Sequence, residues 1–115
     1  MAEEQFAGRG QVDNVWVSEP GRNLTFSILL KPSFLAVDNQ FYLNQTICLG
    51  INDTLRRYFD TRATIKWPND CYVDNQKIGG ILIENVIQGN AIKHSIIGIG
   101  LNINQTEFPP QLKNV

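Results

Sequence analysis

The sequence lacks any long apolar run. No stretch approaches the roughly 18 to 20 consecutive apolar residues that a membrane-spanning helix needs. The first ten residues contain Glu3 and Glu4 and no apolar core, which is not the composition of a secretory signal peptide. We therefore expect a cytoplasmic protein that does not cross a membrane.

An excess of either charge is also missing. The 10 Lys and Arg residues nearly balance the 11 Asp and Glu residues, which leaves a formal net charge of −1 and a sequence pI of about 5.7. The basic residues are scattered, and only Arg56 and Arg57 are adjacent. Binding to nucleic acid or to an anionic membrane surface needs a concentrated basic patch, so neither is an expected function.

Cysteine and histidine are scarce. The two cysteines, Cys48 and Cys71, lack C-x-x-C spacing, and His94 is the single histidine. This argues against a disulfide framework and against a zinc site, and we assign no metal ligand from the sequence. His94 has polar neighbours, so we expect it to be exposed and catalytically idle, whereas the cysteines are expected to be buried small hydrophobic residues.

The composition that remains is that of a globular domain, and 115 residues are enough for one small domain and too few for two. Hydrophobic periodicity predicts, in chain order, a loop over 8–23, a strand over 23–30, a helix over 39–59, a strand over 63–67, a hairpin of 71–73 and 77–84, a strand over 91–104 and a tail over 105–115. Turn sequences at 74–76 and 88–90 join the later strands. The predicted fold class is α+β, a mostly antiparallel mixed sheet with one long helix on a face.

The predicted helix has recognisable ends. Asp38 or Asn39 is expected to cap its N-terminus, and Arg56 and Arg57 lie near its C-terminus, where cations suit the helix dipole. Gly50 lies inside the helix at a cost of up to about 1 kcal/mol relative to Ala. Close packing against the sheet is the expected reason for this glycine.

The final predicted strand carries the clearest sign of a ligand site. Its apolar residues fall on one face, whereas Gly98, Gly100 and Asn102 fall on the other. The neighbouring hairpin strand adds Gly79 and Gly80. Glycines within a strand mark close approach by a ligand or by another backbone. This face is therefore either the floor of a ligand site or a place where a bulge or a packed helix needs room.

Two basic residues are candidates for binding an anion. Arg9 lies between Gly8 and Gly10, and glycines let backbone N–H groups crowd around an anion that the arginine can bind bidentately. The alternative is a flexible surface turn. Lys66, next to Trp67 at the end of a predicted strand, is the second candidate, although a lone lysine at such a position is usually solvated.

Three parts of the sequence resemble biotin protein ligases. They are residues 5–10 with Trp16 downstream, residues 66–70 with 77–84, and residues 98–102. Their order and spacing also fit, the resemblance covers nearly the whole chain, and its most specific part is K-W-P-N-D followed by K-I-G-G-I-L. Residues 1–115 are accordingly expected to be a partial biotin/lipoate ligase catalytic domain, with a fold like that of class II aminoacyl-tRNA synthetases.

The resemblance implies a two-step reaction that uses ATP and Mg²⁺. The carboxylate of biotin attacks the α-phosphate of ATP, which gives biotinyl-5′-AMP and pyrophosphate. A lysine of a biotin carboxyl carrier protein then attacks that mixed anhydride. Because the carboxylate and the phosphates are already ionised, catalysis needs positioning and charge neutralisation more than acid–base chemistry.

The resemblance also implies roles for individual residues. Arg9 and Lys66 are the implied catalytic residues. Arg9 would hold the anionic end of the ligand, and Lys66 would stabilise charge that develops on the carboxylate and phosphate oxygens. The residues implied to form the biotin and ATP site are Gln5, Gly8, Arg9, Gly10, Gln11, Trp16, Lys66, Lys77, Gly79, Gly98, Gly100 and Asn102.

Within that site the implied positions differ. Gly79, Gly98 and Gly100 would form the floor and leave room for the bicyclic ring and acyl chain of biotin. Trp16 would pack near the adenine. Asn102 would face the phosphates or the metal ion, and Lys77 would lie on the same rim as Lys66.

The sequence departs from the family in its glycine-rich loop and at its ends. Asp13 stands where a third loop glycine is usual, and Gln11 stands where many members have Arg. A carboxylate near an anion site should weaken binding, so Asp13→Gly is expected to strengthen binding of biotin or ATP, and unchanged affinities would contradict this. The resemblance further implies that the chain begins after the upstream biotin-binding strand and ends before the C-terminal part of the domain. The resulting sheet edge is expected to favour self-association.

Two alternatives remain open. A lipoate–protein ligase shares the fold, although K-W-P-N-D argues against it, and equilibrium binding of biotin against lipoate would separate the two. The chain could also be a truncated, non-catalytic remnant that binds a carrier protein or itself. A biotin-dependent release of pyrophosphate from ATP would rule out that remnant.

Overall fold

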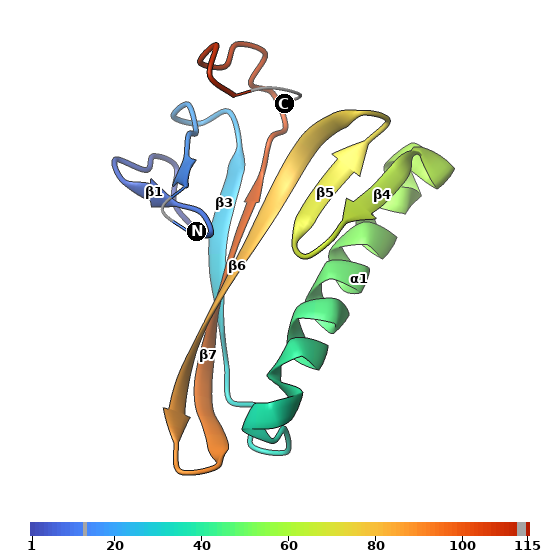
Figure 1. Cartoon of the computed structure of the whole chain (residues 1–115). Coiled ribbons are helices and arrows are strands. Elements are labelled where there is room, and N and C mark those ends of the chain that lie inside the picture. The colour runs from blue at the N-terminus through green and yellow to red at the C-terminus, as the bar shows by residue number, and fades with distance from the viewer. Residues whose placement is uncertain (13, 113–114) are drawn as a thin grey trace.

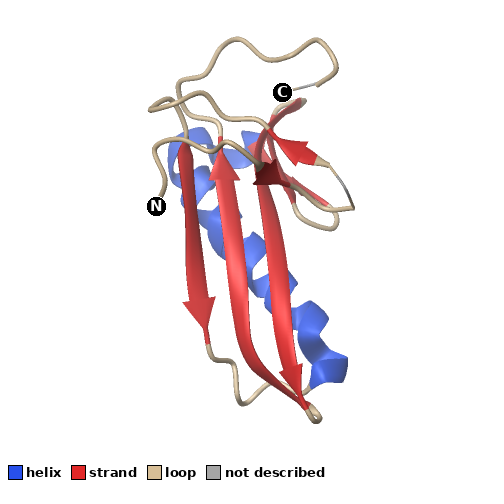
Figure 2. Ribbon diagram, turned by 90° about the vertical axis from the view of Figure 1, so that its left-hand side faces the viewer, coloured by secondary structure: helices blue, strands red, loops and turns tan. Residues whose placement is uncertain are grey.

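A computed structural model of the chain describes residues 1–12, 14–112 and 115, and its centre is a five-stranded antiparallel sheet (Figure 1). The strands lie in the order β3-β7-β6-β5-β4. Their bounds are β3 Leu24–Leu30, β4 Ala63–Lys66, β5 Asp70–Val73, β6 Gln76–Gln88 and β7 Ala91–Leu101. Helix α1, Gln40–Phe59, crosses one face of the sheet, behind the long strands in Figure 2. The predicted α+β class, with one long helix on the sheet, is confirmed.

Two tight turns fix the middle of the sheet. Two residues connect β5 to β6, and two connect β6 to β7. Each turn contains a positive φ, 54° at Asp74 and 61° at Gly89. Such conformations suit two-residue hairpins because their twist matches that of the flanking strands. As a result, β6 pairs with β5 on one side and with β7 on the other.

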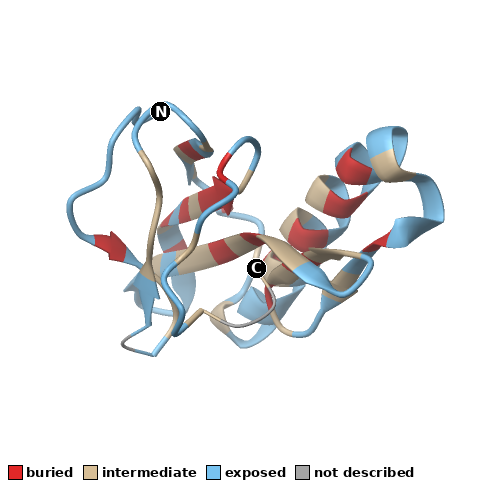
Figure 3. Ribbon diagram, turned by 90° about the horizontal axis from the view of Figure 1, so that it is seen from above, coloured by how far each residue is buried: buried red, intermediate tan, exposed pale blue. Residues whose placement is uncertain are grey.

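The hydrophobic core lies between α1 and the sheet. Leu43, Cys48 and Leu55 are buried along one side of the helix. Ile97 and Ile99 of β7 are 0% and 2% exposed on the sheet side. Figure 3 shows the buried parts of the helix turned toward the strands. The apolar face predicted for the final strand is therefore the core face.

The two cysteines belong to this core, as expected. Cys48 and Cys71 are 3% and 0% exposed. Burial raises the pKa of the Cys71 thiol to about 12 and also raises the pKa of Cys48. Because the thiolate is the reactive form, neither side chain is a nucleophile at neutral pH.

The helix itself differs from expectation at two points. Val37–Asn39 forms a 3₁₀ turn, and Asn39 occupies the N-cap position without a capping side-chain hydrogen bond. A second 3₁₀ turn, Asp60–Arg62, follows the helix. Gly50 is exposed, and a Cβ built on it would meet no atom within 4 Å. Packing against the sheet is therefore the wrong explanation for Gly50.

In the described part of the chain, no helix is long and apolar enough to span a bilayer.

The segment before β3 covers the other face of the sheet. The sequence predicts an uninterrupted loop over 8–23, but this segment contains strands β1, Gly8–Arg9, and β2, Val15–Trp16, which pair antiparallel. We call residues 8–16 the N-terminal hairpin. In Figure 1 it lies on the side of β3 and β6 away from α1. Strands of two residues are too short to show alternation, so periodicity could not predict them.

Candidate functional site

The helix-free face of the sheet lacks side chains at its centre. The register aligns Thr25, Gly100, Gly80, Asp70 and Lys66 in one row across β3, β7, β6, β5 and β4. Directly paired residues point to the same face. The row therefore carries polar groups at both ends and two missing side chains in the middle. Gly98 leaves a third gap in the next row on this face.

A cavity of about 570 Å³ lies between this face and the N-terminal segment. The N-terminal segment lines it with Gln5, Arg9, Gly10, Gln11, Asn14 and Trp16. The sheet and the turn before β5 line it with Thr25, Ser27, Asn69, Asp70, Lys77, Gly80, Leu82, Glu84, Gly98 and Gly100, among others. Small-molecule sites in proteins usually have volumes of roughly 300 to 1,000 Å³. The cavity is therefore large enough for a ligand of that kind.

The indole of Trp16 covers one part of the cavity floor. A Cβ built on Gly100 would lie 2.5 Å from Trp16 Cε2, and one on Gly80 would lie 3.2 Å from Trp16 Cζ3. A Cβ on Gly98 would meet nothing closer than 3.6 Å. Neither a bulge nor a packed helix, the alternative expected from the sequence, takes up the space over these glycines. Gly80 and Gly100 make room for the chain's own tryptophan, and Gly98 leaves open floor.

The charged side chains that line the cavity are paired with each other. Arg9 Nη2 lies 2.9 Å from Glu84 Oε2 at the mouth, where both side chains are largely solvent-accessible. Lys77 Nζ lies 2.8 Å from Asp70 Oδ1, and this pair is about three-quarters buried, with side-chain exposures of 28% and 25%. Lys77 Nζ also lies 6.0 Å from the centre of the Trp16 ring, within the range of a cation–π contact. One arginine and one lysine are thus available to an anionic ligand only in competition with carboxylates.

Four of the residues implied by the resemblance do not line this cavity. Lys66 is exposed and faces the cavity side of the sheet, but its Nζ lies 5.7 Å from the Tyr72 ring centre. Gly8 lies against the Trp16 carbonyl, and no Cβ would fit there. Asn102 lines a separate cavity of about 60 Å³ behind Trp16, and its buried Oδ1 has no hydrogen-bond partner.

Gly79 is the fourth, and it lies on the opposite face. A Cβ built on it would lie 2.6 Å from Leu101 Cδ2 and 3.4 Å from Cys71 Cβ, both in the core. The reason is a β-bulge, because Tyr72 pairs with Lys77 while Cys71 pairs with Gly79. The extra residue, Ile78, reverses the alternation. Lys77 therefore shares the cavity face with Gly80 and not with Gly79.

Pro68 and Asn69 of the K-W-P-N-D segment fix the turn before β5 by hydrogen bonds. Asn69 is buried, its Nδ2 donates to the Ile81 carbonyl, and its own carbonyl accepts from the Ile81 N–H. Asn44 of α1 donates to the Pro68 carbonyl at 2.7 Å. These hydrogen bonds tie the start of β5 to both β6 and the helix. Asp70 and Lys77 gain fixed positions from this turn.

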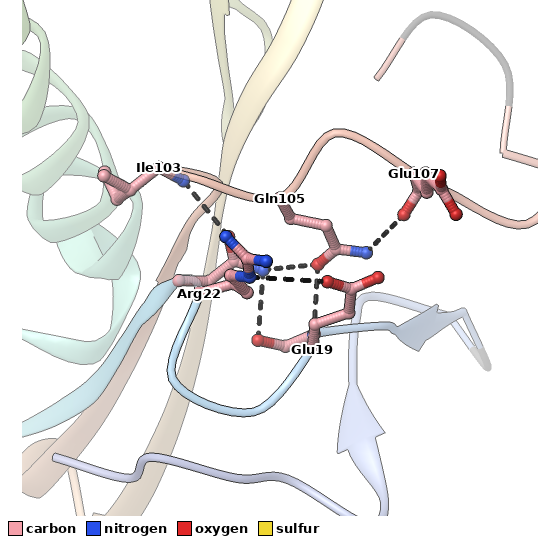
Figure 4. A network of polar contacts seen from close by, with 7 residues as sticks. Glu19, Arg22, Ile103, Gln105 and Glu107 are labelled. Carbon is pink, nitrogen blue, oxygen red and sulfur yellow. Dashed lines mark hydrogen bonds and ion pairs between the residues drawn. The ribbon is translucent and has the colours of Figure 1, made fainter.

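A polar network around the buried side chain of Gln105 joins the segments that follow Trp16 and Asn102. Gln105 Oε1 accepts from the Glu19 N–H at 3.0 Å and from Asn23 Nδ2, and Gln105 Nε2 donates to the Glu107 carbonyl at 2.8 Å (Figure 4). The Ile103 N–H donates to Asn23 Oδ1 at 3.1 Å. The strand predicted to reach 104 ends at Leu101, and this network holds the chain beyond it.

Several lining residues escaped sequence reasoning. Thr25 and Ser27 alternate with the core residues of β3, which was a usable signal once β3 was known to border the site. Glu84 and Asp70 lie inside the segments that carry the resemblance but were given no role. Asp13 was expected to affect the anion site, and it lies outside the residues that the structure describes.

The chain is similar in sequence and in structure to known proteins. Residues 1–102 match the model of the biotin/lipoate A/B protein ligase family. The chain belongs to this family. It is 32% identical over 117 residues to the bifunctional ligase/repressor BirA of Bacillus subtilis, and 34% identical over 105 residues to a biotin–[acetyl-CoA-carboxylase] ligase of Paracoccus denitrificans. The biotin protein ligase from Aquifex aeolicus in complex with biotin and ATP matches it with a TM-score of 0.80 at 33% identity.

These biotin ligases are considerably longer than the chain. The match covers 100% of the chain and 36% of the B. subtilis relative, 90% and 43% for the P. denitrificans relative, and 98% and 45% for the A. aeolicus structure. The expected resemblance to biotin protein ligases and to their fold is confirmed. The chain spans less than half the length of these family members.

Proposed function

We propose that the chain carries part of the active site of a cytoplasmic biotin–protein ligase. The reaction would form biotinyl-5′-AMP from biotin and ATP and then transfer the biotinyl group to a lysine of a biotin carboxyl carrier protein. The observation that carries the proposal is the cavity between the N-terminal hairpin and the glycine face, with Arg9 at its mouth. Family membership and the biotin and ATP bound to the A. aeolicus neighbour support it.

The proposed chemistry makes modest demands on the protein. A carboxylate oxygen of biotin forms a bond to the α-phosphorus of ATP, and the bond to pyrophosphate breaks. The lysine amine of the carrier then forms an amide with the acyl carbon, AMP leaves, and the amine loses a proton. Both steps bring anionic oxygens together, so fixed cations in a partly dry site contribute most. Arg9 would bind the anionic centre, and the open floor at Gly98 would take the apolar part of biotin.

Lys66 needs a change of position to take its implied role. It faces the cavity side of the sheet in the same row as Gly80 and Gly100, but it is not among the lining residues. We propose that Lys66 reaches the phosphates at the rim when ATP is bound, while Lys77 stays beside Trp16. A lysine side chain has a flexible four-carbon stem, so such a movement costs little free energy.

The oxygen atoms near the cavity fit a magnesium ion that arrives with ATP. The described residues contain no group of three or more His, Cys, Asp or Glu side chains that could hold a metal ion. Magnesium at nucleotide sites is usually held by one or two carboxylates together with the phosphates. The Asp70 carboxylate, which lines the cavity, would hold it in this chain together with the phosphates. When bound, the ion would neutralise phosphate charge.

Calorimetric titration with biotin, and with biotin plus ATP and Mg²⁺, tests the proposal. We expect binding of biotin and biotin-dependent release of pyrophosphate. A charge-assisted hydrogen bond contributes about 1.5 to 3 kcal/mol, so Arg9→Gln should weaken binding roughly tenfold or more. Arg56→Gln, on the helix, is the matched control and should bind like the parent chain. Absence of biotin binding, or biotin binding without release of pyrophosphate, would contradict the proposal.

Two other functions are separated by the same assay. The family includes lipoate ligases, and a lipoate–protein ligase would prefer lipoate to biotin in the titration. The position of Lys66 outside the cavity favours a second alternative, a non-catalytic domain that binds ligand or carrier protein without adenylation. That alternative predicts biotin binding with no release of pyrophosphate.

Self-association through the edge strand β3 is part of the proposal. Only one partner of β3 is a strand, β7, and the described chain adds a single bridge between Ala2 and Thr25 on the other side. Leu29 on this edge is 62% exposed. An open edge offers unpaired backbone groups to a second copy. Sedimentation velocity over a range of concentrations should show a dimer, and Ile28→Pro should abolish it.

A further inference from the structure

The two cations that line the cavity differ in how firmly carboxylates hold them. Lys77 and Asp70 form a pair that is about three-quarters buried and lies beside the Trp16 ring. Arg9 and Glu84 form a pair at the mouth, with side-chain exposures of 70% and 45%. An exposed pair is weak and can exchange partners readily, whereas a partly buried pair exchanges less easily. An incoming anion would therefore displace Glu84 before it displaced Asp70.

Glu84 is held in a position from which it can compete. It lies on β6, two residues beyond Leu82, whose backbone borders the open floor at Gly98. Arg9 reaches it from β1, and β1 is fixed because Gly8 pairs with Trp16 and Trp16 rests on Gly80 and Gly100. The Arg9 side chain therefore extends across the mouth of the cavity from the N-terminal hairpin to β6. Among the residues that the structure describes, Glu84 is the carboxylate that contacts its guanidinium there.

We propose that Glu84 competes with anionic ligands for Arg9 and thereby lowers the affinity of the cavity for a carboxylate or phosphate relative to a neutral ligand. The inference rests on the proposed function. Glu84 acts in two ways that have the same sign. It holds the guanidinium that an anion needs, and its own negative charge repels the anion. A neutral ligand meets neither effect, because it does not draw Arg9 away from Glu84.

The expected effect follows from the exposure of the pair. Measured exposed ion pairs correspond to factors of roughly two to five in an equilibrium constant. Replacing Glu84 by Gln, which has the same shape and no charge, should therefore strengthen binding of an anionic ligand by roughly two- to fivefold. The gain should be largest near 10 mM salt, where the screening length is about 30 Å, and should vanish near 1 M salt, where it is about 3 Å.

The test is calorimetry on the 115-residue chain with three probes: biotin, the neutral biotinamide, and pyrophosphate. Glu84→Gln should strengthen binding of biotin and pyrophosphate and leave biotinamide unchanged. Glu84→Asp, which keeps the charge, should restore parent-like affinities to within about twofold. Asp53→Asn removes one negative charge from α1 on the other face of the sheet and should change none of the three affinities.

The outcomes separate this inference from the proposed function. Equal biotin and pyrophosphate affinities in the parent chain and in Glu84→Gln would overturn the inference and leave the ligase proposal standing. Weaker anion binding in Glu84→Gln would also overturn it, because Glu84 would then support Arg9 and not compete for it. If neither the parent chain nor any variant bound biotin while Glu84→Gln still strengthened pyrophosphate binding, the ligase proposal would fail. The inference that Glu84 competes with anions for Arg9 would stand.

Discussion

The two faces of the sheet are covered by different kinds of contact. On one face α1 buries Leu43, Cys48 and Leu55 against Ile97 and Ile99, and this side is apolar and closely packed. On the other face the N-terminal hairpin rests on glycines through a single indole, and an exposed ion pair closes its edge. Burial of apolar area supplies most of the stability of a domain. The helix face therefore contributes most of the stability, whereas the hairpin face depends on fewer and more exposed contacts.

Truncation on the helix face should have the largest effect on stability. Ile97→Ala removes a side chain that is 0% exposed, so we expect a loss of about 2 to 5 kcal/mol in the free energy of unfolding. Ile96→Ala, one residue away on the cavity face and 40% exposed, is the matched control. Urea unfolding followed by circular dichroism measures both. Equal losses would show that the two faces do not differ as described.

The second largest loss of stability is expected from the polar network around Gln105. Gln105→Ala leaves the Glu19 N–H and the Asn23 amide without their acceptor, and because these donors are part-buried the expected loss is at most about 1 to 3 kcal/mol. Gln111→Ala in the exposed tail is the control. The same urea experiment measures the change. A loss no larger than that of the control would mean that water replaces Gln105 without cost.

Adding a methyl group to the floor distinguishes its two parts. Gly100→Ala places a Cβ 2.5 Å from the Trp16 ring and should displace it, with a loss of about 1 to 3 kcal/mol. Gly98→Ala has its nearest neighbour at 3.6 Å and should be tolerated. Emission of Trp16 in a Trp67→Phe background should shift to the red in Gly100→Ala alone. Similar spectra for the two variants would contradict the placement of the indole.

The smallest expected effect is a gain in stability. Gly50 is an exposed helical residue with open space around it, so Gly50→Ala should stabilise the chain by up to about 1 kcal/mol. Thermal unfolding at fixed pH measures the gain. A loss of stability would contradict the open space around Gly50, because it would mean that the added methyl group meets other atoms.

Local sequence information was sufficient wherever one pattern ran over many residues. The alternation in β3 and β7 and the helical spacing over residues 41–59 predicted those elements, and the alternation in β7 also predicted its core face. It failed where one residue reverses the alternation. The bulge at Ile78 moved Gly80, and not Gly79, to the cavity face, and its position is set by pairing with β5 and not by β6 itself. Pairing between distant segments, as in the Arg9–Glu84 contact across 75 positions, leaves no local signal.

The hairpin's place in the chain has one further consequence. The whole cover up to Trp16 is a single stretch that precedes β3, whereas the helix and all five strands of the main sheet come after it. Residues 1–16 could therefore be exchanged as one segment between related chains without altering the sequence of the helix or of the main sheet. Such an exchange would carry Arg9 with the N-terminal segment and leave Glu84 and the glycines of the floor behind.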